Sequence, residues 1–140
     1  MSSRVAVQCV GLTKAYGAIG AVDRLDLTVE QGQILAVLGP SGCGKTTALR
    51  LIAGFETPDA GTVEIGGRIV AGPTMHLAPE KRQVGMVFQE YALFPHLSVA
   101  DNIAYGLPRG PGRMDRATEV MSLTSLGGLG KRMPHQLSGG

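Results

Sequence analysis

A chain of 140 residues is enough for one ordinary domain and short for two. Its formal net charge of +2, with Lys and Arg scattered along the chain, excludes the basic stripe of a nucleic-acid-binding protein, so no nucleic-acid partner is expected. The longest apolar run, Ile34 to Leu38, is far below the roughly 18 residues of a membrane span, so any membrane role is expected to be peripheral and made through a partner.

The first predicted elements are strands. Alternating apolar and polar residues indicate half-buried strands at Arg4 to Leu12 and Ala21 to Glu30. TKAYGAIG, between them, is predicted to be a turn-rich connector that carries Tyr16. The continuous apolar run ILAVL is typical of a strand buried on both faces of a parallel or mixed sheet.

The next segment combines a helix with further strands. A helix is predicted from Lys45, with apolar residues at helical spacing in TTALRLIAGF, and Gly54 ends it. GTVEIGGRIV indicates a short hairpin. Val84 to Phe88 is predicted to be another buried strand, which ends at Gln89.

Two helices are predicted in the last third of the chain. Ser98 is expected to cap a helix that runs to about Gly106, with Asp101 as its reciprocal partner. PRGPGR is a loop by composition, and MDRATEVMSLTSL is predicted to form an amphipathic helix before a glycine-rich tail.

The strongest motif is GPSGCGKTT, which matches the phosphate-loop pattern G-x-x-x-x-G-K-[ST]. Glycines let the backbone turn its N–H groups onto phosphate oxygens, and the helix dipole adds to that field. Lys45 would reach the terminal phosphates, and the Thr46 hydroxyl would bind Mg²⁺. The candidate nucleotide ligands are Gly39, Pro40, Ser41, Gly42, Cys43, Gly44, Lys45, Thr46 and Thr47. The alternative is a glycine-rich turn beside a surface lysine.

Three further features narrow the class of nucleotide-binding protein. Tyr16 precedes the loop, where its ring could stack on a base, although composition alone favours an ordinary packed tyrosine. Gln89 ends a predicted strand, from which its amide could reach Mg²⁺, orient an attacking water or simply face solvent. The chain closes on LSGG, in which Ser138, Gly139 and Gly140 could open a phosphate-binding turn.

The order of Tyr16, GPSGCGKTT, VFQEYALFPHLSVADNIAYGL and LSGG resembles the ATP-binding subunit of an ABC transporter over essentially the whole chain. The resemblance implies that Tyr16 stacks on adenine and that GPSGCGKTT is the Walker A loop for ATP and Mg²⁺. It also implies that Gln89 is the Q-loop residue, which contacts Mg²⁺ and acts in catalysis together with Lys45. LSGG would be the family signature, which closes over ATP held by a second subunit, so that two chains pair head to tail.

The same resemblance implies an α/β fold of the P-loop NTPase type, with an N-terminal β-subdomain, a phosphate-loop strand and helix, and a helical subdomain. Residues from about 1 to 90 would form the nucleotide-binding core, and about 91 to 140 the helical subdomain. The region from Gln89 to Leu97 would touch a membrane permease through the apolar side chains of EYALFPHL, unless these pack internally. Those side chains are Tyr91, Phe94, Pro95 and Leu97.

The implied setting is an importer on the cytoplasmic face of the inner membrane, served indirectly by a periplasmic or extracellular solute-binding protein. MSSRVAVQCV lacks the apolar run of a secretory leader, which favours the cytosol. Within the family, the stretch VFQEYALFPHLSVADNIAYGL is most similar to the corresponding stretch of importers for ferric iron, polyamines, phosphonates, sulfate or maltose. In such importers the membrane and binding-protein subunits select the cargo. The alternatives are a non-transport ABC ATPase, a soluble P-loop kinase or GTPase, and a stand-alone nucleotide-binding module; the absence of Asn-Lys-x-Asp argues against a GTPase.

One element of the family, the Walker B strand that ends in Asp and is followed by a catalytic Glu, has no match in the chain. No switch histidine follows the signature, since the three histidines are His76, His96 and His135, and His96 is expected to be exposed without a catalytic role. Phosphoryl transfer needs a carboxylate for Mg²⁺ and a group that orients the nucleophile. The 140 residues are therefore expected to be the N-terminal part of a longer protein, to bind nucleotide weakly and not to hydrolyse it alone.

Overall fold

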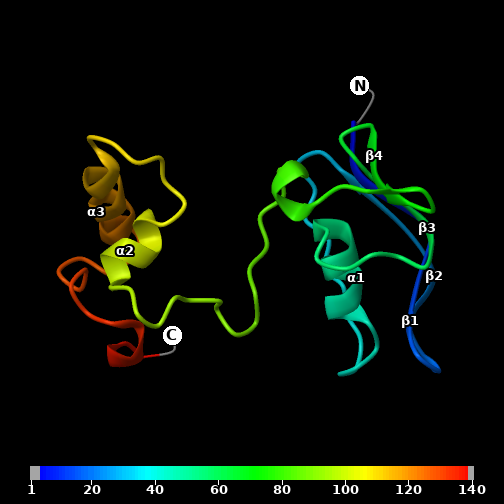
Figure 1. Ribbon diagram of the computed structural model, residues 1–140, viewed down its shortest axis with the longest axis horizontal. Helices are drawn as coiled ribbons and strands as arrows, with labels where there is room; N and C mark the ends of the chain where they lie inside the picture. The colour runs from blue at the N-terminus through cyan, green and yellow to red at the C-terminus, as the bar shows by residue number, and fades with distance from the viewer. Residues whose placement is uncertain (1–3, 139–140) are drawn as a thin grey trace. The chain divides into compact units, whose positions relative to one another are not determined.

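The computed structural model describes residues 4–138, and the chain divides into two compact units, residues 1–86 and 87–140. Each unit has its own elements and its own packing (Figure 1). Within residues 4–138, no helix combines the length and the apolar character needed to cross a bilayer.

The first unit is built on an antiparallel sheet with the strand order β2-β1-β3-β4-β5. Its strands are β1 (Val5–Tyr16), β2 (Ile19–Glu30), β3 (Ala60–Ile65), β4 (Arg68–Gly72) and β5 (Met75–His76). The predicted hairpin GTVEIGGRIV is confirmed as β3 and β4, joined by Gly66 and Gly67 at φ 58° and 82°. Two successive residues with positive φ match the twist of the flanking strands, and glycine adopts that backbone without a Cβ clash.

Helix α1 (Lys45–Ala53) packs on one face of this sheet, as Figure 1 shows. Its start at Lys45 and its end before Gly54 confirm the predicted helix; Gly54 has φ 94° and donates its N–H to the Arg50 carbonyl. Leu51 of α1 is fully buried against the inward-facing side chains of the strands. Those side chains are Cys9, Leu12, Val22, Val63, Val70 and Ala71.

Arg82 joins the C-terminal end of α1 to the segment that follows β5. It comes directly after the short 3-10 helix η1 (Pro79–Lys81) and, among residues 4–138, is the one charged side chain that is buried. Its guanidinium donates to three main-chain carbonyls, those of Leu77, Leu51 and Ile52, over 2.7, 2.8 and 2.9 Å. A Cβ on Gly54 would lie 2.6 Å from Nε of Arg82, so glycine is required there by packing as well as by φ.

The second unit contains α2 (Val99–Ala104), α3 (Arg113–Leu123) and the 3-10 helix η2 (Pro134–Gln136). The predicted cap is confirmed, because Ser98 Oγ accepts the N–H of Asp101 over 3.2 Å. Asp101 reciprocates by accepting the Ser98 hydroxyl over 2.6 Å. The helix ends at Ala104, short of Gly106.

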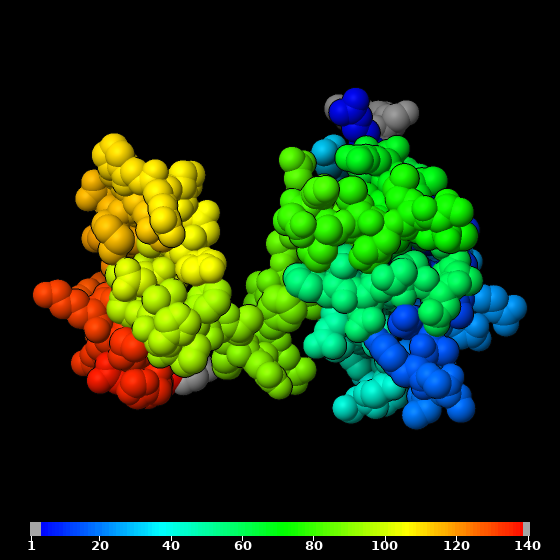
Figure 2. Space-filling model, viewed as in Figure 1, coloured from blue at the N-terminus to red at the C-terminus, as the bar shows by residue number. Residues whose placement is uncertain are grey.

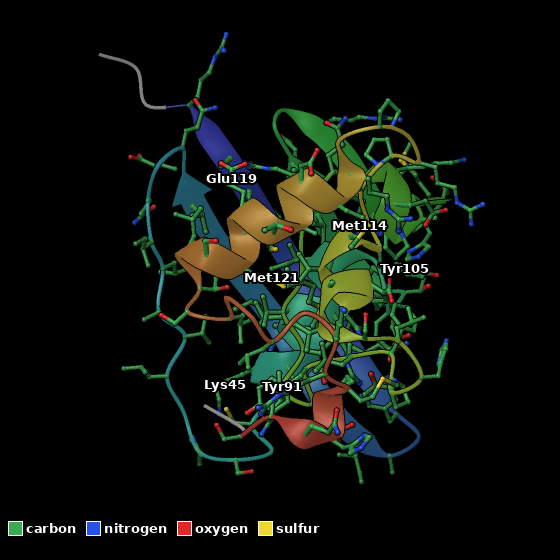
Figure 3. All side chains as sticks on the ribbon, turned by 90° about the vertical axis from the view of Figure 1, so that its left-hand side faces the viewer. Lys45, Tyr91, Tyr105, Met114, Glu119 and Met121 are labelled. Atoms are coloured by element: carbon green, nitrogen blue, oxygen red, sulfur yellow. The ribbon has the colours of Figure 1, made fainter. Side chains whose placement is uncertain are left out.

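Helices α2 and α3 pack through small and flexible side chains, and Ala104, Ala117 and Met121 are buried between them. Figure 3 shows Met114 and Met121 on the side of α3 toward α2, with Glu119 on the opposite side. This amphipathic pattern confirms the predicted second helix, although it ends at Leu123.

Three predictions about secondary structure are wrong. Tyr16 is the last residue of β1 rather than part of a connector, because the two-residue turn at 17–18 lets the strands pair up to Tyr16 and Ile19. The runs Ile34 to Leu38 and Val84 to Phe88 form no strand, and Ile34, Leu38 and Val87 are 95%, 90% and 94% exposed. A strand requires a hydrogen-bonded neighbour, and no described residue supplies one to either run.

Candidate functional site

The phosphate loop turns into α1 through glycines with positive φ. Gly42 has φ 80°, and Gly44, the N-cap of α1, has φ 96°. No side chain caps the first turn, and no acidic residue lies in it, so the orphan N–H groups of a helix start face outward together with the positive end of the dipole. A Cβ on Gly44 would lie 1.9 Å from the Ala21 carbonyl oxygen, so this loop can approach β2 only with glycine at that position.

Lys45 folds back across the loop that it follows. Its Nζ donates to the carbonyls of Gly39 and Pro40, both over 2.7 Å, and lies 3.5 Å from Sγ of Cys43. These partners are neutral, and none of them is a carboxylate. An ammonium held only by neutral partners forms a stronger hydrogen bond when an anionic phosphate oxygen comes within reach.

A cavity of about 270 Å³ lies beside the loop. Its apolar lining comes from β2, the segment before the loop and α1, through Val22, Leu25, Val37, Leu38 and Ala48. Its lining also includes the charged residues Asp23 and Lys45. A concave, mostly apolar surface with a few convergent polar groups is the usual form of a small-molecule site.

Tyr16 lies at the end of the unit that carries the loop. The turn between β1 and β2 and the loop before α1 occupy the same end of the first unit in Figures 1 and 2. Tyr16 pairs with Ile19, and Ala21, which Gly44 contacts, is two residues further along β2, or about 7 Å. The Tyr16 ring is 46% exposed, so it is available to a ligand in a way that a packed tyrosine is not.

The remaining predicted site residues belong to the second unit. Gln89 is exposed in a turn, and Ser138 is exposed after η2. Gly139 and Gly140, the rest of the predicted signature turn, lie outside the described residues. The structure therefore brings together the phosphate loop, Lys45 and the part of β2 around Ala21 and Val22, and all of these line one cavity within the first unit.

The chemistry of the donor set fits a magnesium nucleotide. Residues 4–138 contain no cluster of three or more His, Cys, Asp or Glu side chains that could hold a metal ion. Mg²⁺ does not require such a cluster, since it keeps several waters and is commonly bound through one or two side chains and the phosphates of its nucleotide. The exposed Thr46 hydroxyl in the first turn of α1 can supply one such oxygen.

The segment predicted to contact a permease is organised by Asn102, which sequence reasoning missed. Asn102 Oδ1 accepts the N–H of Phe94 over 2.9 Å, and its Nδ2 donates to the carbonyls of Phe94, Leu97 and Ser98 over 3.1, 3.0 and 3.0 Å. The Phe94 ring lies 4.2 Å, centroid to centroid, from that of Tyr105. Tyr91 is 66% exposed, and Pro95 and His96 are also exposed, which confirms the predicted exposure of His96.

Two other contacts near the site were also missed. Lys14 Nζ lies 5.5 Å from the centroid of the Tyr16 ring and 3.3 Å from Oδ1 of Asp59. The spacing of Lys14 and Tyr16 is a usable signal, because residues two apart in a strand share a face. Asp59 is remote in sequence and carries no such signal.

Comparison with known proteins places these features in a family. Residues 22–140 match the family described as ABC transporter. The chain is 49% identical over 132 residues to the sulfate/thiosulfate import ATP-binding protein CysA 2 of Chromobacterium violaceum, covering 92% of this chain and 35% of that protein. It is 48% identical over 133 residues to the Fe(3+) ions import ATP-binding protein FbpC of Brucella abortus, covering 92% and 36%.

A similar solved structure is the dimeric post-hydrolysis state of the ATP-binding cassette MJ0796 bound to ADP and Pi. It shares 28% sequence identity with this chain at a TM-score of 0.80, over 95% of this chain and 63% of that one. The chain thus spans little more than a third of the curated relatives and under two thirds of the solved cassette. Because the family match extends over most of its length, the chain belongs to the ABC transporter family.

Proposed function

We propose that this chain supplies the phosphate-binding part of an ATP-binding subunit that powers solute import through a membrane permease. The observation that carries the proposal is Lys45, whose ammonium is held over the loop by the Gly39 and Pro40 carbonyls at the uncapped start of α1. The relatives CysA 2 and FbpC are import ATP-binding proteins for different cargoes, which is consistent with other subunits choosing the solute.

Binding would begin with the exchange of partners by Lys45. Its Nζ leaves the two loop carbonyls for the terminal phosphates, while the N–H groups of the loop and the first turn of α1 donate to phosphate oxygens. Each charge-assisted hydrogen bond contributes about 1.5–3 kcal/mol, so several of them are consistent with micromolar affinity. Bound Mg²⁺ would supply charge neutralisation between the phosphates, and Thr46 would offer it a hydroxyl.

The base would lie toward the open end of β1 and β2. The Tyr16 ring is exposed there, and a base–aromatic stack contributes about 1–3 kcal/mol. The apolar cavity wall formed by Val22, Leu25 and Leu38 gives the ribose and base a surface from which water is displaced. Tyr16 and the phosphate loop are then two ends of one nucleotide site.

Hydrolysis and transport would require the whole protein. In this proposal Gln89 contacts Mg²⁺ or the attacking water, and Ser138, Gly139 and Gly140 face ATP held by a second copy in a head-to-tail dimer. The MJ0796 cassette is dimeric in its solved structure, which supports the pairing of two copies. Residues from about 1 to 90 would form the nucleotide-binding core and those from about 91 to 140 the helical subdomain.

The permease would bind the region from Gln89 to Leu97. Tyr91, Phe94, Pro95 and Leu97 lie in or beside the turn that Asn102 fixes, and Tyr91 and Pro95 are exposed. The subunit would then sit at the cytoplasmic face of the inner membrane as a peripheral component, with a solute-binding protein acting on the other side.

The test is ATP hydrolysis by the whole protein, compared with Lys45→Ala and with the surface control Glu119→Gln. Glu119 forms an exposed ion pair with Arg116 on α3 and has no role at the loop. We expect Lys45→Ala to abolish turnover and Glu119→Gln to leave it unchanged. The 140 residues alone should show no turnover above their own Lys45→Ala variant, since no apolar run in this sequence ends in the Asp-Glu pair of the Walker B strand. Lys45-independent hydrolysis by the whole protein would contradict the proposal.

A further inference from the structure

The exposed ring of Tyr16 contacts the ammonium of Lys14, a lysine on the same strand. Lys14 and Tyr16 are two residues apart on β1, and Lys14 Nζ lies 5.5 Å from the ring centroid, within the range of a cation–π interaction. The Lys14 side chain is only 15% exposed, whereas Tyr16 is 46% exposed. The Lys14 side chain therefore packs along the protein surface beside the ring, and much of the ring stays accessible.

Asp59 holds this arrangement from another part of the chain. It directly precedes β3, and its carboxylate accepts the main-chain N–H of Ala15 over 2.7 Å and the ammonium of Lys14 over 3.3 Å. The N–H of Asp59 donates to the carbonyl of Thr13 over 2.9 Å. Asp59 thus binds three successive residues of β1, from 13 to 15, immediately before Tyr16.

These contacts reduce the freedom of the Tyr16 ring before any ligand arrives. Without Asp59, the ammonium of Lys14 would be free to move with its long side chain. In the described sheet, β1 pairs with β3 up to Thr13, and residues 14–16 of β1 pair with β2 alone. A ring whose position is already fixed loses less conformational entropy when a flat ligand stacks on it. With a cation near one face, stacking is directed to the other face.

We propose that Lys14 and Asp59 are positioning residues for base recognition, which hold the Tyr16 ring so that one face receives the nucleobase. The inference rests on the proposed function, in which Tyr16 stacks on the base. It adds that the ion pair Lys14–Asp59 contributes to affinity for the base and not to affinity for the phosphates.

Binding of the base and binding of the phosphates can be measured separately. Inorganic triphosphate carries the phosphates without a base, so the loop and Lys45 bind it but Tyr16 does not. Loss of either partner of the ion pair should weaken ATP binding and leave triphosphate binding as it is. A general loss of structure would instead weaken the binding of both ATP and triphosphate.

The experiment is titration calorimetry of the whole protein with ATP and with inorganic triphosphate, each with Mg²⁺. Lys14→Met removes the ammonium and keeps most of the apolar stem, and Asp59→Asn removes the charge and keeps an oxygen for the Ala15 N–H. We expect each variant to raise the Kd for ATP about five- to tenfold, because a fivefold to tenfold change corresponds to the lower half of the about 1–3 kcal/mol that a base stack contributes. The Kd for triphosphate should stay within twofold.

Three controls make the outcome unambiguous. Tyr16→Phe keeps the ring and should bind both ligands as the wild type does, whereas Tyr16→Ala should show the full loss of base affinity with unchanged triphosphate binding. Glu119→Gln removes an exposed ion pair on α3 and should change neither value. The inference would be overturned if Lys14→Met and Asp59→Asn weakened the binding of ATP and of triphosphate equally, or if they left the affinity for ATP unchanged.

Failure of the proposed function has a different signature. In that case the wild type would bind neither ligand, or Lys45→Ala would bind both as tightly as the wild type. Either result would remove the basis of the inference as well, before any variant of the ion pair is compared.

Discussion

Replacing Arg82 by Met should destabilise α1 strongly, although Arg82 is far along the chain from the phosphate loop that α1 carries. The side chain is 3% exposed and donates to the carbonyls of Leu51, Ile52 and Leu77. Two of these carbonyls belong to the last turn of α1, where a helix leaves its acceptors without intrahelical partners. Met fills a similar volume and donates to none of them.

The magnitude follows from the acceptors that lose their donor. A buried acceptor left without a partner costs about 1–3 kcal/mol. The removed guanidinium no longer has to be desolvated, which offsets part of the loss. We therefore expect a loss of about 3 kcal/mol in the stability of α1, or about a hundredfold faster amide exchange in this helix.

The assay is hydrogen–deuterium exchange of the α1 amides in the whole protein, with Arg50→Met as the matched control. Arg50 is an exposed arginine in the last turn of the same helix, so its loss removes only an interaction with the helix dipole, worth less than about 1 kcal/mol. Arg82→Lys, which keeps the charge but not the fork of donors, should fall between the two. The reasoning is refuted when Arg82→Met and Arg50→Met accelerate exchange in α1 equally.

Further predictions concern the loop, the two thiols and one carboxylate. Gly44→Ala should lower the Tm more than Gly42→Ala. Each substitution costs at least about 1–2 kcal/mol of stability, because alanine is strained in the left-handed backbone conformation of both positions. Only at Gly44 would the new Cβ also lie 1.9 Å from a main-chain oxygen of β2. A thiol-alkylating reagent should label exposed Cys43 and spare Cys9, because burial raises the pKa of the Cys9 thiol to about 11, and Mg-ATP should slow the labelling of Cys43; equal rates with and without nucleotide would contradict this. The wild type should have a higher Tm than Asp59→Asn at neutral pH, and the difference should shrink as the pH falls below about 4. The reason is that the hydrogen bond from the Ala15 N–H lowers the pKa of the Asp59 carboxyl in the folded state below its unfolded value of about 3.9. A Tm difference that stays constant down to about pH 2 would contradict this prediction.

Features with local causes could be predicted from the sequence. Gly54 ends α1, Gly66 and Gly67 form the turn of a hairpin, and Ser98 caps α2, because each depends on residues a few positions away. The phosphate loop belongs to the same class, since its glycines and Lys45 act through one turn and one helix start.

Features that depend on residues distant in the sequence could not be predicted from the sequence. ILAVL has the composition of a buried strand, but whether it forms one is decided by neighbouring strands, and residues 4–138 provide none. Arg82 reads as a surface residue in a polar segment, yet the carbonyl acceptors at the end of α1 draw it into the core. Asp59 and Lys14 are far apart in sequence, and only the pairing of β1 with β3 brings them together.

The most direct test of nucleotide binding at the loop is the affinity of the whole protein for Mg-ATP in wild type, Lys45→Ala and Lys81→Ala forms. Lys81 is an exposed lysine of η1 outside the site and controls for the loss of one positive charge. Lys45 is held by two carbonyls at the start of α1, so we expect micromolar binding that Lys81→Ala retains and Lys45→Ala weakens at least tenfold. Equal affinities in all three forms would contradict the assignment of the phosphate loop as the nucleotide site.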